Sequence, residues 1–226
     1  MTKPAATPNT PTPRRWPLFD LSILTAHLEL RIPTDEQLFE LAELATKPIH
    51  EPGAAPFLVP WTDGTESQRA VGTLQWNWRA RAEFSPEQWR LNFVVICNDE
   101  IIGAQDLCAE VFVERREVST GSWLVQSEQG KGYGKEMRSA VLTLAFDSLG
   151  ARWATSSSRT DNLSSRGVSV ASGYRHDGVE VDNYKGSEVV RDRWRLSRSD
   201  WINRHDSSPV RIDGIAACLS MLGLAD

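Results

Sequence analysis

A glycine-rich hexapeptide, Gln129 to Gly134, is the part of this sequence with the clearest chemical potential. The run 119–125 before it has the composition of a strand, and the run 135–149 after it that of a helix. A turn in this position exposes backbone N–H groups at a helix N-terminus, where partial positive charge favours an anion such as pyrophosphate. Glycines permit close approach because they lack a Cβ. Lys131 adds a positive charge at the rim.

Two common phosphate-binding patterns do not fit this hexapeptide. The P-loop sequence, in which Gly-Lys-Ser/Thr follows a spaced glycine, is absent. The dinucleotide-binding pattern G-x-G-x-x-G also fails, because Gly130, Gly132 and Gly134 are spaced G-x-G-x-G and no suitably placed acidic residue follows. A plain turn between strand and helix stays open as an interpretation of the hexapeptide alone.

Composition limits the classes of protein to consider. The chain has 226 residues, 40% of them hydrophobic and 24% charged, with a formal net charge of -5. These values are typical of a globular protein with a substantial core and argue against a general nucleic-acid partner. No apolar run approaches the roughly 18 residues needed to span a bilayer, so we expect no membrane partner. The three cysteines form no metal-ligand pair, so no metal is expected and the default location is cytoplasmic.

Hydrophobic periodicity predicts the elements that position the hexapeptide. Thr34 and Gln37 predict a capping box at the start of one helix, and Gly150 the end of another. The helix 132–149 should place Met137, Val141 and Leu149 on a sheet. Strands are expected over 27–32, 89–97, 101–110, 119–125, 152–156, 174–181 and 188–196, and further helices over 66–82, 164–171 and 199–204.

Two motifs in the expected order resemble one known family. Gln129-x-x-Gly132-x-Gly134 is similar to the acetyl-CoA signature Q/R-x-x-G-x-G/A of the GNAT N-acetyltransferases. The segment Asn162 to Tyr174 resembles that family's N-x-x-S-x-x-V-x-x-x-G-Y/F, with Ser172 in place of the usual leucine. Gly121-Ser122-Trp123-Leu124 together with the hexapeptide is similar to the RimJ/RimL-type branch. The resemblance covers about residues 28–196 and implies an α/β (α+β) GNAT fold, with a mixed sheet of about six to seven strands and about four helices.

The family resemblance implies roles for residues on the cofactor side. The backbone of Leu124 and Val125, at a splayed strand, would hold the pantetheine arm of acetyl-CoA. Asn162 would also bind pantetheine, and Ser165 would protonate the departing thiolate, or else cap the following helix. The residues implied in binding the pyrophosphate loop are Gln129, Gly130, Lys131, Gly132, Tyr133 and Gly134.

The implied reaction is direct attack of an amine on acetyl-CoA in a ternary complex, which requires a proton acceptor. Asp106 and Glu110 end the strand expected beside the cofactor strand, and alternation places them on one face. We prefer Glu110 as base or amine-binding carboxylate, with Asp106 as a substrate contact. Glu110 could equally be a solvated charge at a strand end. His50, Glu51 and Asp177 are weaker candidates.

The acceptor is the least determined part of the prediction. The RimJ/RimL resemblance implies a protein or peptide amine, either an N-terminus or a lysine. Trp61 in the loop 49–65 and Trp78 in the helix 66–82 are expected to contact substrate, although aromatic residues pack in cores equally often. A small apolar amine is an alternative acceptor. A non-catalytic module that senses acyl-CoA is an alternative function.

The ends of the chain are expected to lie outside the acetyltransferase domain. Residues 1–15 are rich in Pro and Thr and predict a disordered tail, and residues 16–204 a single domain. Residues 205–226 are expected to form a C-terminal extension with an apolar end. This extension could pack on a second subunit or on its own domain, so both a monomer and a homodimer are open.

Overall fold

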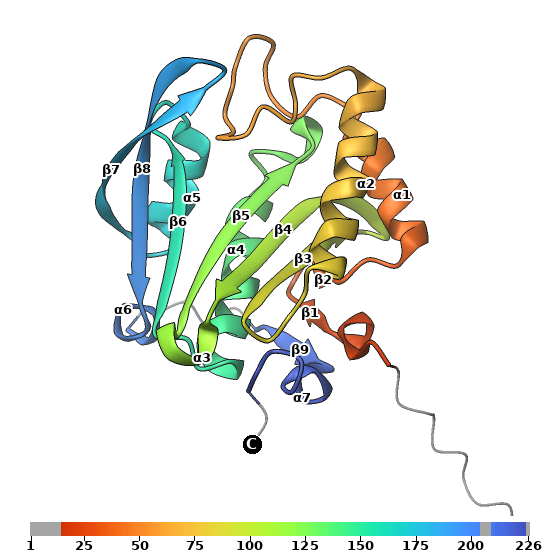
Figure 1. Cartoon of the computed structure of the whole chain (residues 1–226), viewed down its shortest axis with the longest axis vertical. Coiled ribbons are helices and arrows are strands. Elements are labelled where there is room, and N and C mark those ends of the chain that lie inside the picture. Colours follow the sequence, from red (N-terminus) through yellow and green to blue (C-terminus); the bar gives the residue numbers. More distant parts are fainter. Residues whose placement is uncertain (1–14, 204–208, 225–226) are drawn as a thin grey trace, which may run out of the picture.

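One mixed sheet of nine strands organises the molecule (Figure 1). The computed structural model describes residues 15–203 and 209–224, so nearly all of the predicted N-terminal tail lies outside the described residues. The strand order is β7-β8-β6-β5-β4-β3-β2-β1-β9, and only the β5–β6 pair among the described strands is parallel. The strands are β1 (Ser22–Leu24), β2 (Glu29–Arg31), β3 (Gln88–Cys97), β4 (Glu100–Glu110), β5 (Glu117–Leu124), β6 (Trp153–Arg159), β7 (Arg175–Tyr184), β8 (Ser187–Ser197) and β9 (Arg211–Asp213).

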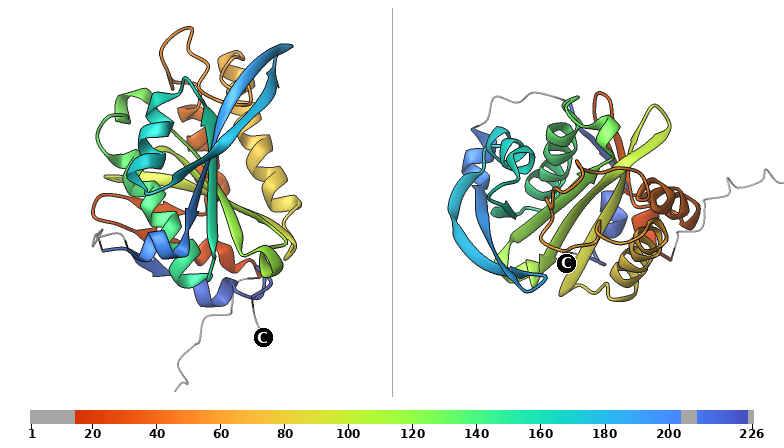
Figure 2. Two further views of the ribbon diagram at one scale, coloured as in Figure 1. Left: turned by 90° about the vertical axis from the view of Figure 1, so that its left-hand side faces the viewer. Right: turned by 90° about the horizontal axis from the view of Figure 1, so that it is seen from above.

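Helices cover both faces of this sheet. The views in Figure 2 place α4 and α5 on one face and α1 and α2 on the other. The described helices are α1 (Asp35–Leu44), α2 (Glu66–Ala82), α3 (Phe112–Arg115), α4 (Tyr133–Thr143), α5 (Leu163–Ala171), α6 (Arg198–Ile202) and α7 (Ile215–Cys218). The α/β architecture with a mixed sheet, expected from the sequence, is confirmed, with more strands and more short helices than predicted.

Side chains at the helix starts account for several of these elements. The predicted capping box of α1 is present, because Thr34 accepts from the Gln37 N–H and the Gln37 side chain accepts from the Thr34 N–H. Thr65 and Gln68 make the same reciprocal bonds at the start of α2. Gly150, with φ of 70°, follows the π-helical turn that continues α4.

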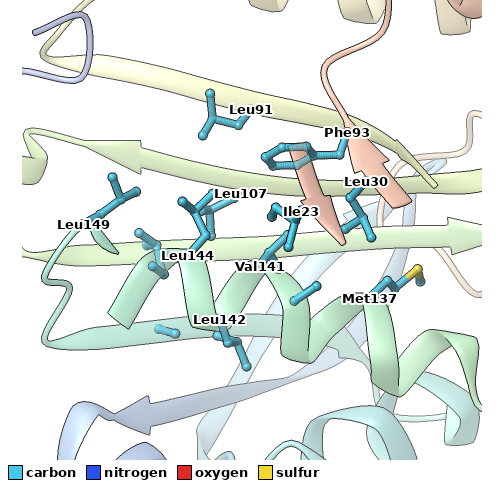
Figure 3. Packing of buried hydrophobic residues seen from close by; sticks show 14 of the residues in the cluster. Ile23, Leu30, Leu91, Phe93, Leu107, Met137, Val141, Leu142, Leu144 and Leu149 are labelled. Carbon is cyan, nitrogen blue, oxygen red and sulfur yellow. The ribbon is translucent and has the colours of Figure 1, made fainter. Parts of the chain in front are cut away.

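The main core lies between α4 and the sheet. Figure 3 shows Met137, Val141 and Leu144 facing the side chains of Leu91, Phe93 and Leu107 on β3 and β4. The α4 residues predicted for this face are buried, with exposed fractions of 3% for Met137 and 0% for Val141. A smaller cluster on the opposite face packs α1 on the sheet, and its buried members are Leu38, Leu41, Leu44, Val94, Ala104 and Val125.

Within the segment expected to be a C-terminal extension, the described residues 209–224 pack on the rest of the chain. β9 pairs antiparallel with β1, and the side chains of Cys218 and Leu222 are fully buried in the main core. Gly214 permits this docking, because a Cβ built on it would lie 2.1 Å from the backbone oxygen of Asp20. The segment between β4 and β5 contains α3, a single short helix.

Candidate active site

The parallel strands β5 and β6 diverge in the middle of the sheet. Their parallel pairing covers only three positions and ends at Ser119 opposite Thr155. β5 continues to Leu124, still paired with β4, while β6 continues to Arg159, paired with β8. The result is a V-shaped gap, in which the β6-facing edge of the last residues of β5 has no ladder partner. Leu124 and Val125, which were predicted to line a splayed strand, lie at the open end of this gap.

The glycine-rich turn lies at the open end of the gap and leads into α4. Gly130 and Gly132 adopt φ values of 75° and 94°, which glycine tolerates and other residues rarely adopt. Gly132 is the N-cap of α4 and offers no side-chain acceptor to the first turn. The other long helices of the described chain, α1, α2 and α5, all begin with a capping side chain. The α4 N-terminus is therefore the one among them left open for an external anion.

Three side chains of the hexapeptide make contacts within the protein, and one of them is Tyr133, whose hydroxyl accepts from the Cys97 thiol at 3.4 Å. The Gln129 amide nitrogen donates to the Leu124 oxygen (2.8 Å) and to the Ile49 oxygen (2.7 Å). It therefore holds the turn against the end of β5. The Lys131 Nζ pairs with both oxygens of Glu128, at 2.9 and 3.0 Å, on an exposed surface. An exposed pair of this kind is weak, so Lys131 remains available to an incoming phosphate.

Asn162 and Ser165 occupy the start of α5. The Asn162 Oδ1 accepts from the Ser165 N–H at 3.0 Å, so Asn162, and not Ser165, is the cap of this helix. The Asn162 amide nitrogen donates to the Pro56 oxygen at 3.0 Å. Pro56 belongs to the loop 49–65, so this contact ties the loop to α5. Ser165 is half-buried in the first turn.

The loop 49–65 closes the same end of the molecule (Figure 1). Besides the Pro56 contact, its Asp63 accepts from the Tyr184 hydroxyl at 2.9 Å and pairs with Lys185 at the tip of the β7–β8 hairpin. Near the start of the loop, the Nε2 atom of His50 is hydrogen-bonded to the Thr62 hydroxyl at 2.9 Å. The loop thus runs from the α1 side of the sheet to the hairpin beyond the gap.

Asp106 lies beside the gap on the sheet face opposite α4. It pairs in register with Gly121, two residues beyond the last paired position of β5 and β6. Burial raises the pKa of Asp106 to about 6, although the nearby Arg90 guanidinium, 3.4 Å from the carboxylate, opposes the rise. About 21% of the side chain stays exposed, so the carboxylate remains reachable. A carboxyl group with this pKa can accept a proton near neutral pH.

Glu110 is placed differently from Asp106, although both lie on the same side of β4 as predicted. It is exposed at the last position of the strand, opposite Gln88, and away from the gap. Glu110 lines a groove of about 490 Å³ that begins beside Ser119 and Thr155, where the two strands separate. The other residues that line this groove are Trp76, Arg79, Ala80, Glu83, Gln88, Trp89, Arg90, Cys108, Ala109, Arg115, Glu117 and Val118.

The predicted aromatic contacts lie in separate places. Trp61 packs against Trp123 of β5, with ring centroids 5.4 Å apart, and so lies over the strand that borders the gap. Trp78 on α2 is 43% exposed and does not line the groove. Its neighbour Trp76 does line the groove, and its ring lies 4.5 Å from the Arg90 guanidinium carbon.

Sequence reasoning did not single out Arg90 or Cys108, which both line the groove. Arg90 and Cys108 stand opposite each other on β3 and β4, a relation that requires the strand register and is invisible in the sequence. Burial raises the pKa of the Cys108 thiol to about 12. The thiol is therefore protonated near neutral pH and is a poor nucleophile, which favours direct transfer over a cysteine-bound acyl intermediate.

Comparisons with known proteins identify the family. Residues 27–175 match the family model described as "Acetyltransferase (GNAT) domain". The match covers more than half of the chain, and the protein belongs to this family of acyltransferases. Its members use acetyl-CoA, for which the open α4 N-terminus and the gap between β5 and β6 offer a fitting site.

Solved structures share the fold at low sequence identity. A ribosomal-protein-serine acetyltransferase, described as putative, from Vibrio cholerae is 19% identical, with a TM-score of 0.59 over 78% of this chain and 97% of that one. The ribosomal alpha-N-protein acetyltransferase RimL, in complex with coenzyme A, is 18% identical, with a TM-score of 0.59 over 76% and 95%. A chimera of the spermidine N-acetyltransferase SpeG from Vibrio cholerae is 17% identical, with a TM-score of 0.61 over 79% and 100%.

The described residues contain neither a cluster of metal ligands nor a helix that could span a membrane. No group of three or more His, Cys, Asp or Glu side chains in this part of the chain could hold a metal ion. Among the helices that the structure describes, none is both long and apolar enough to cross a membrane.

Proposed function

We propose that this protein transfers the acetyl group of acetyl-CoA directly to the amine of a protein or peptide, with Asp106 as the general base. The observation that carries the proposal is the position of Asp106. Its carboxyl group, with a pKa of about 6, borders the gap between β5 and β6 on the face opposite the glycine-rich turn. The cofactor and the acceptor would therefore approach the gap from opposite faces of the sheet.

Separate groups of residues bind the cofactor, accept the proton and contact the acceptor. The N–H groups of residues 130–134 bind the pyrophosphate, and the β6-facing edge of β5 beyond Ser119, which has no ladder partner, hydrogen-bonds the pantetheine arm. Asp106 takes the proton that the acceptor amine must lose before or during attack. Glu110 lies farther along the groove, where it contacts the acceptor instead of the reacting nitrogen. This replaces the sequence-based preference for Glu110 as base, because Asp106 is the carboxylate nearer the gap in register.

The lining of the groove favours a polar acceptor. It carries both signs of charge, with Glu83, Glu110 and Glu117 facing it together with arginines at 79, 90 and 115. A peptide with charged side chains suits such a surface better than a small apolar amine. The resemblance to the RimJ/RimL-type branch, and the shared fold with an enzyme named for ribosomal proteins, point the same way. Asp106 beside the gap favours catalysis over the sensor alternative.

Two carboxylates on one strand provide a matched test. Thiol release from acetyl-CoA would be followed with a panel of N-terminal peptides, lysine peptides and polyamines for wild type, Asp106→Asn and Glu110→Gln. We expect turnover on a peptide class, a fall in kcat of about 10²–10⁴-fold in Asp106→Asn, and mainly a raised KM in Glu110→Gln.

The outcomes separate the alternatives. Full activity of Asp106→Asn, with activity lost in Glu110→Gln, would return the role of base to Glu110. Turnover on polyamines alone would exclude the peptide acceptor. Binding of acetyl-CoA without turnover on any acceptor would favour the sensor function.

A further inference from the structure

An unusually polar interior lies where β5 and β6 diverge, on the face covered by α4 and α5. Such a position between helices and a sheet is normally filled by apolar side chains. Here the Ser158 and Ser169 hydroxyls are buried and have no hydrogen-bond partner among the described residues. The other polar side chains gathered around this place are Thr120, Ser122, Arg138, Ser156 and Tyr174.

Arg138 of α4 is the only charged residue of this group. Its side chain is 3% exposed and reaches both separating strands. Nη1 donates to the Ser156 hydroxyl on β6 at 3.3 Å, and Nη2 donates to the Ser122 hydroxyl on β5 at 3.5 Å. The guanidinium therefore spans the gap just beyond the last paired residues.

The charge of Arg138 is not balanced by the protein. Its contacts are two neutral hydroxyls at long distances and the ring of Tyr174, whose centroid lies 5.9 Å from Cζ. Its Nε has no partner, and no carboxylate of the described chain forms an ion pair with it. A buried, unpaired cation is costly, because its lost hydration is not replaced by an opposite charge. A site that tolerates this cost is suited to an anion supplied by a ligand.

The location indicates which anion this would be. Arg138 follows Gly134 by four residues, so it lies one helical turn into α4 beyond the end assigned to the pyrophosphate. It contacts the two strands that border the gap assigned to the pantetheine arm. The group at the end of that arm is the thioester, whose sulfur acquires negative charge during acyl transfer.

We propose that Arg138 stabilises the thiolate of coenzyme A as the acetyl group leaves. This inference rests on the proposed function. The acceptor nitrogen forms a bond to the acetyl carbon, the carbon–sulfur bond breaks, and the electron pair stays on sulfur. The proton from the nitrogen goes to Asp106. Arg138 meets the new negative charge, so the sulfur does not have to be protonated as it departs. Ser165 and the buried Tyr174 are then not needed as acids.

The test measures binding of the product thiol, independently of turnover. Dissociation constants of coenzyme A and of dethio-coenzyme A, which has hydrogen in place of the thiol, would be measured between pH 6.5 and 10. If the guanidinium binds the thiolate, wild type should prefer coenzyme A increasingly as pH rises. The preference should reach about ten-fold for each unit by which binding lowers the thiol pKa.

Variants at one position distinguish charge stabilisation from bracing. Arg138→Met and Arg138→Gln should bind dethio-coenzyme A like wild type but show no pH-dependent preference for the thiol, whereas Arg138→Lys should keep part of it. If Arg138 only braces the two strands, the Met and Gln variants should bind coenzyme A and dethio-coenzyme A equally more weakly than wild type does. That result would overturn the inference. A flat preference in wild type with tight binding would also overturn it, while leaving the acetyltransferase proposal intact. Failure of wild type to bind either ligand would overturn both.

Discussion

At the scale of single residues, burial and the Arg90 guanidinium act in opposite directions on the pKa of Asp106, the residue that we propose as general base. Burial raises the pKa of Asp106, while Arg90 limits the rise and is itself held against the Trp76 ring. An ionised carboxylate at this position is less stable than it would be in water. The carboxyl group therefore titrates closer to neutral pH than an exposed aspartate does, which suits the proposed role.

The activity should follow the titration of Asp106. We expect kcat/KM for a fixed acceptor to fall below an apparent pKa of about 6, because the protonated carboxyl cannot accept a proton. Replacing Arg90 by Met removes the positive charge that opposes the rise, so this limb should move to higher pH. Acceptors of different amine pKa would be compared as controls. If the acidic limb of the pH profile shifts with the amine pKa of the acceptor and is unchanged in Arg90→Met, Asp106 is not the base.

The same shift has a consequence for stability. Because the pKa of Asp106 is higher in the folded state than its ordinary 3.8, its contribution to the free energy of unfolding is largest below pH 4 and is lost as pH rises to 6. The loss is at most about 3 kcal/mol, from two units of pKa. Asp106→Asn should therefore unfold no more easily than wild type at pH 7. Equal stability of Asp106→Asn and wild type at pH 7 would show that a loss of activity in the variant is not caused by unfolding.

At the scale of elements, the proposed site depends on backbone groups that two elements leave without hydrogen-bond partners. β5 and β6 stop pairing after three positions, and α4 begins without a side-chain cap. Each omission leaves backbone groups that another molecule must satisfy. The neighbouring helix α5 is capped, and its cap, Asn162, also holds the loop 49–65.

Asn162 offers a way to separate these two tasks. Asn162→Asp keeps an oxygen for the Ser165 N–H but loses the donor to the Pro56 oxygen, whereas Asn162→Ala loses both. We expect Asn162→Ala to lower the free energy of unfolding by about 0.5–2 kcal/mol, and Asn162→Asp to leave it nearly unchanged. Both should weaken binding of coenzyme A if the amide nitrogen turns from Pro56 to the pantetheine. Unaltered binding in Asn162→Asp would exclude that role.

The sequence predicted secondary-structure elements better than it predicted contacts between residues that are distant in the chain. The capping box at Thr34, the helix over 66–82 and the apolar face of α4 were all predicted, because each follows from spacing within a short segment. The choice between Asp106 and Glu110 could not be made in this way. It depends on where β5 leaves β6, which is a contact between strands distant in the sequence. Arg138 falls in the same class, since its position on an amphipathic helix gives no sign that it faces hydroxyls across a gap.

At the scale of the whole molecule, the sheet separates two approaches to one gap. The glycine-rich turn and α4 lie at one face of the sheet, and α2 lies at the other (Figure 2). The charged groove is lined by residues of α2, β3, β4 and β5, on the α2 side. The C-terminal segment is remote from the gap and completes the opposite edge of the sheet through β9. A three-residue strand such as β9 has too little periodicity to be predicted from the sequence.

The proposed site is tested most directly by an experimental structure with coenzyme A bound. We expect the pyrophosphate on the N–H groups of residues 130–134, the pantetheine arm between β5 and β6, and the sulfur near the Arg138 guanidinium. We also expect Asp106 to face the sulfur from the opposite side of the gap. Coenzyme A bound elsewhere, or a gap closed by continued pairing of β5 and β6, would rule out the proposed site.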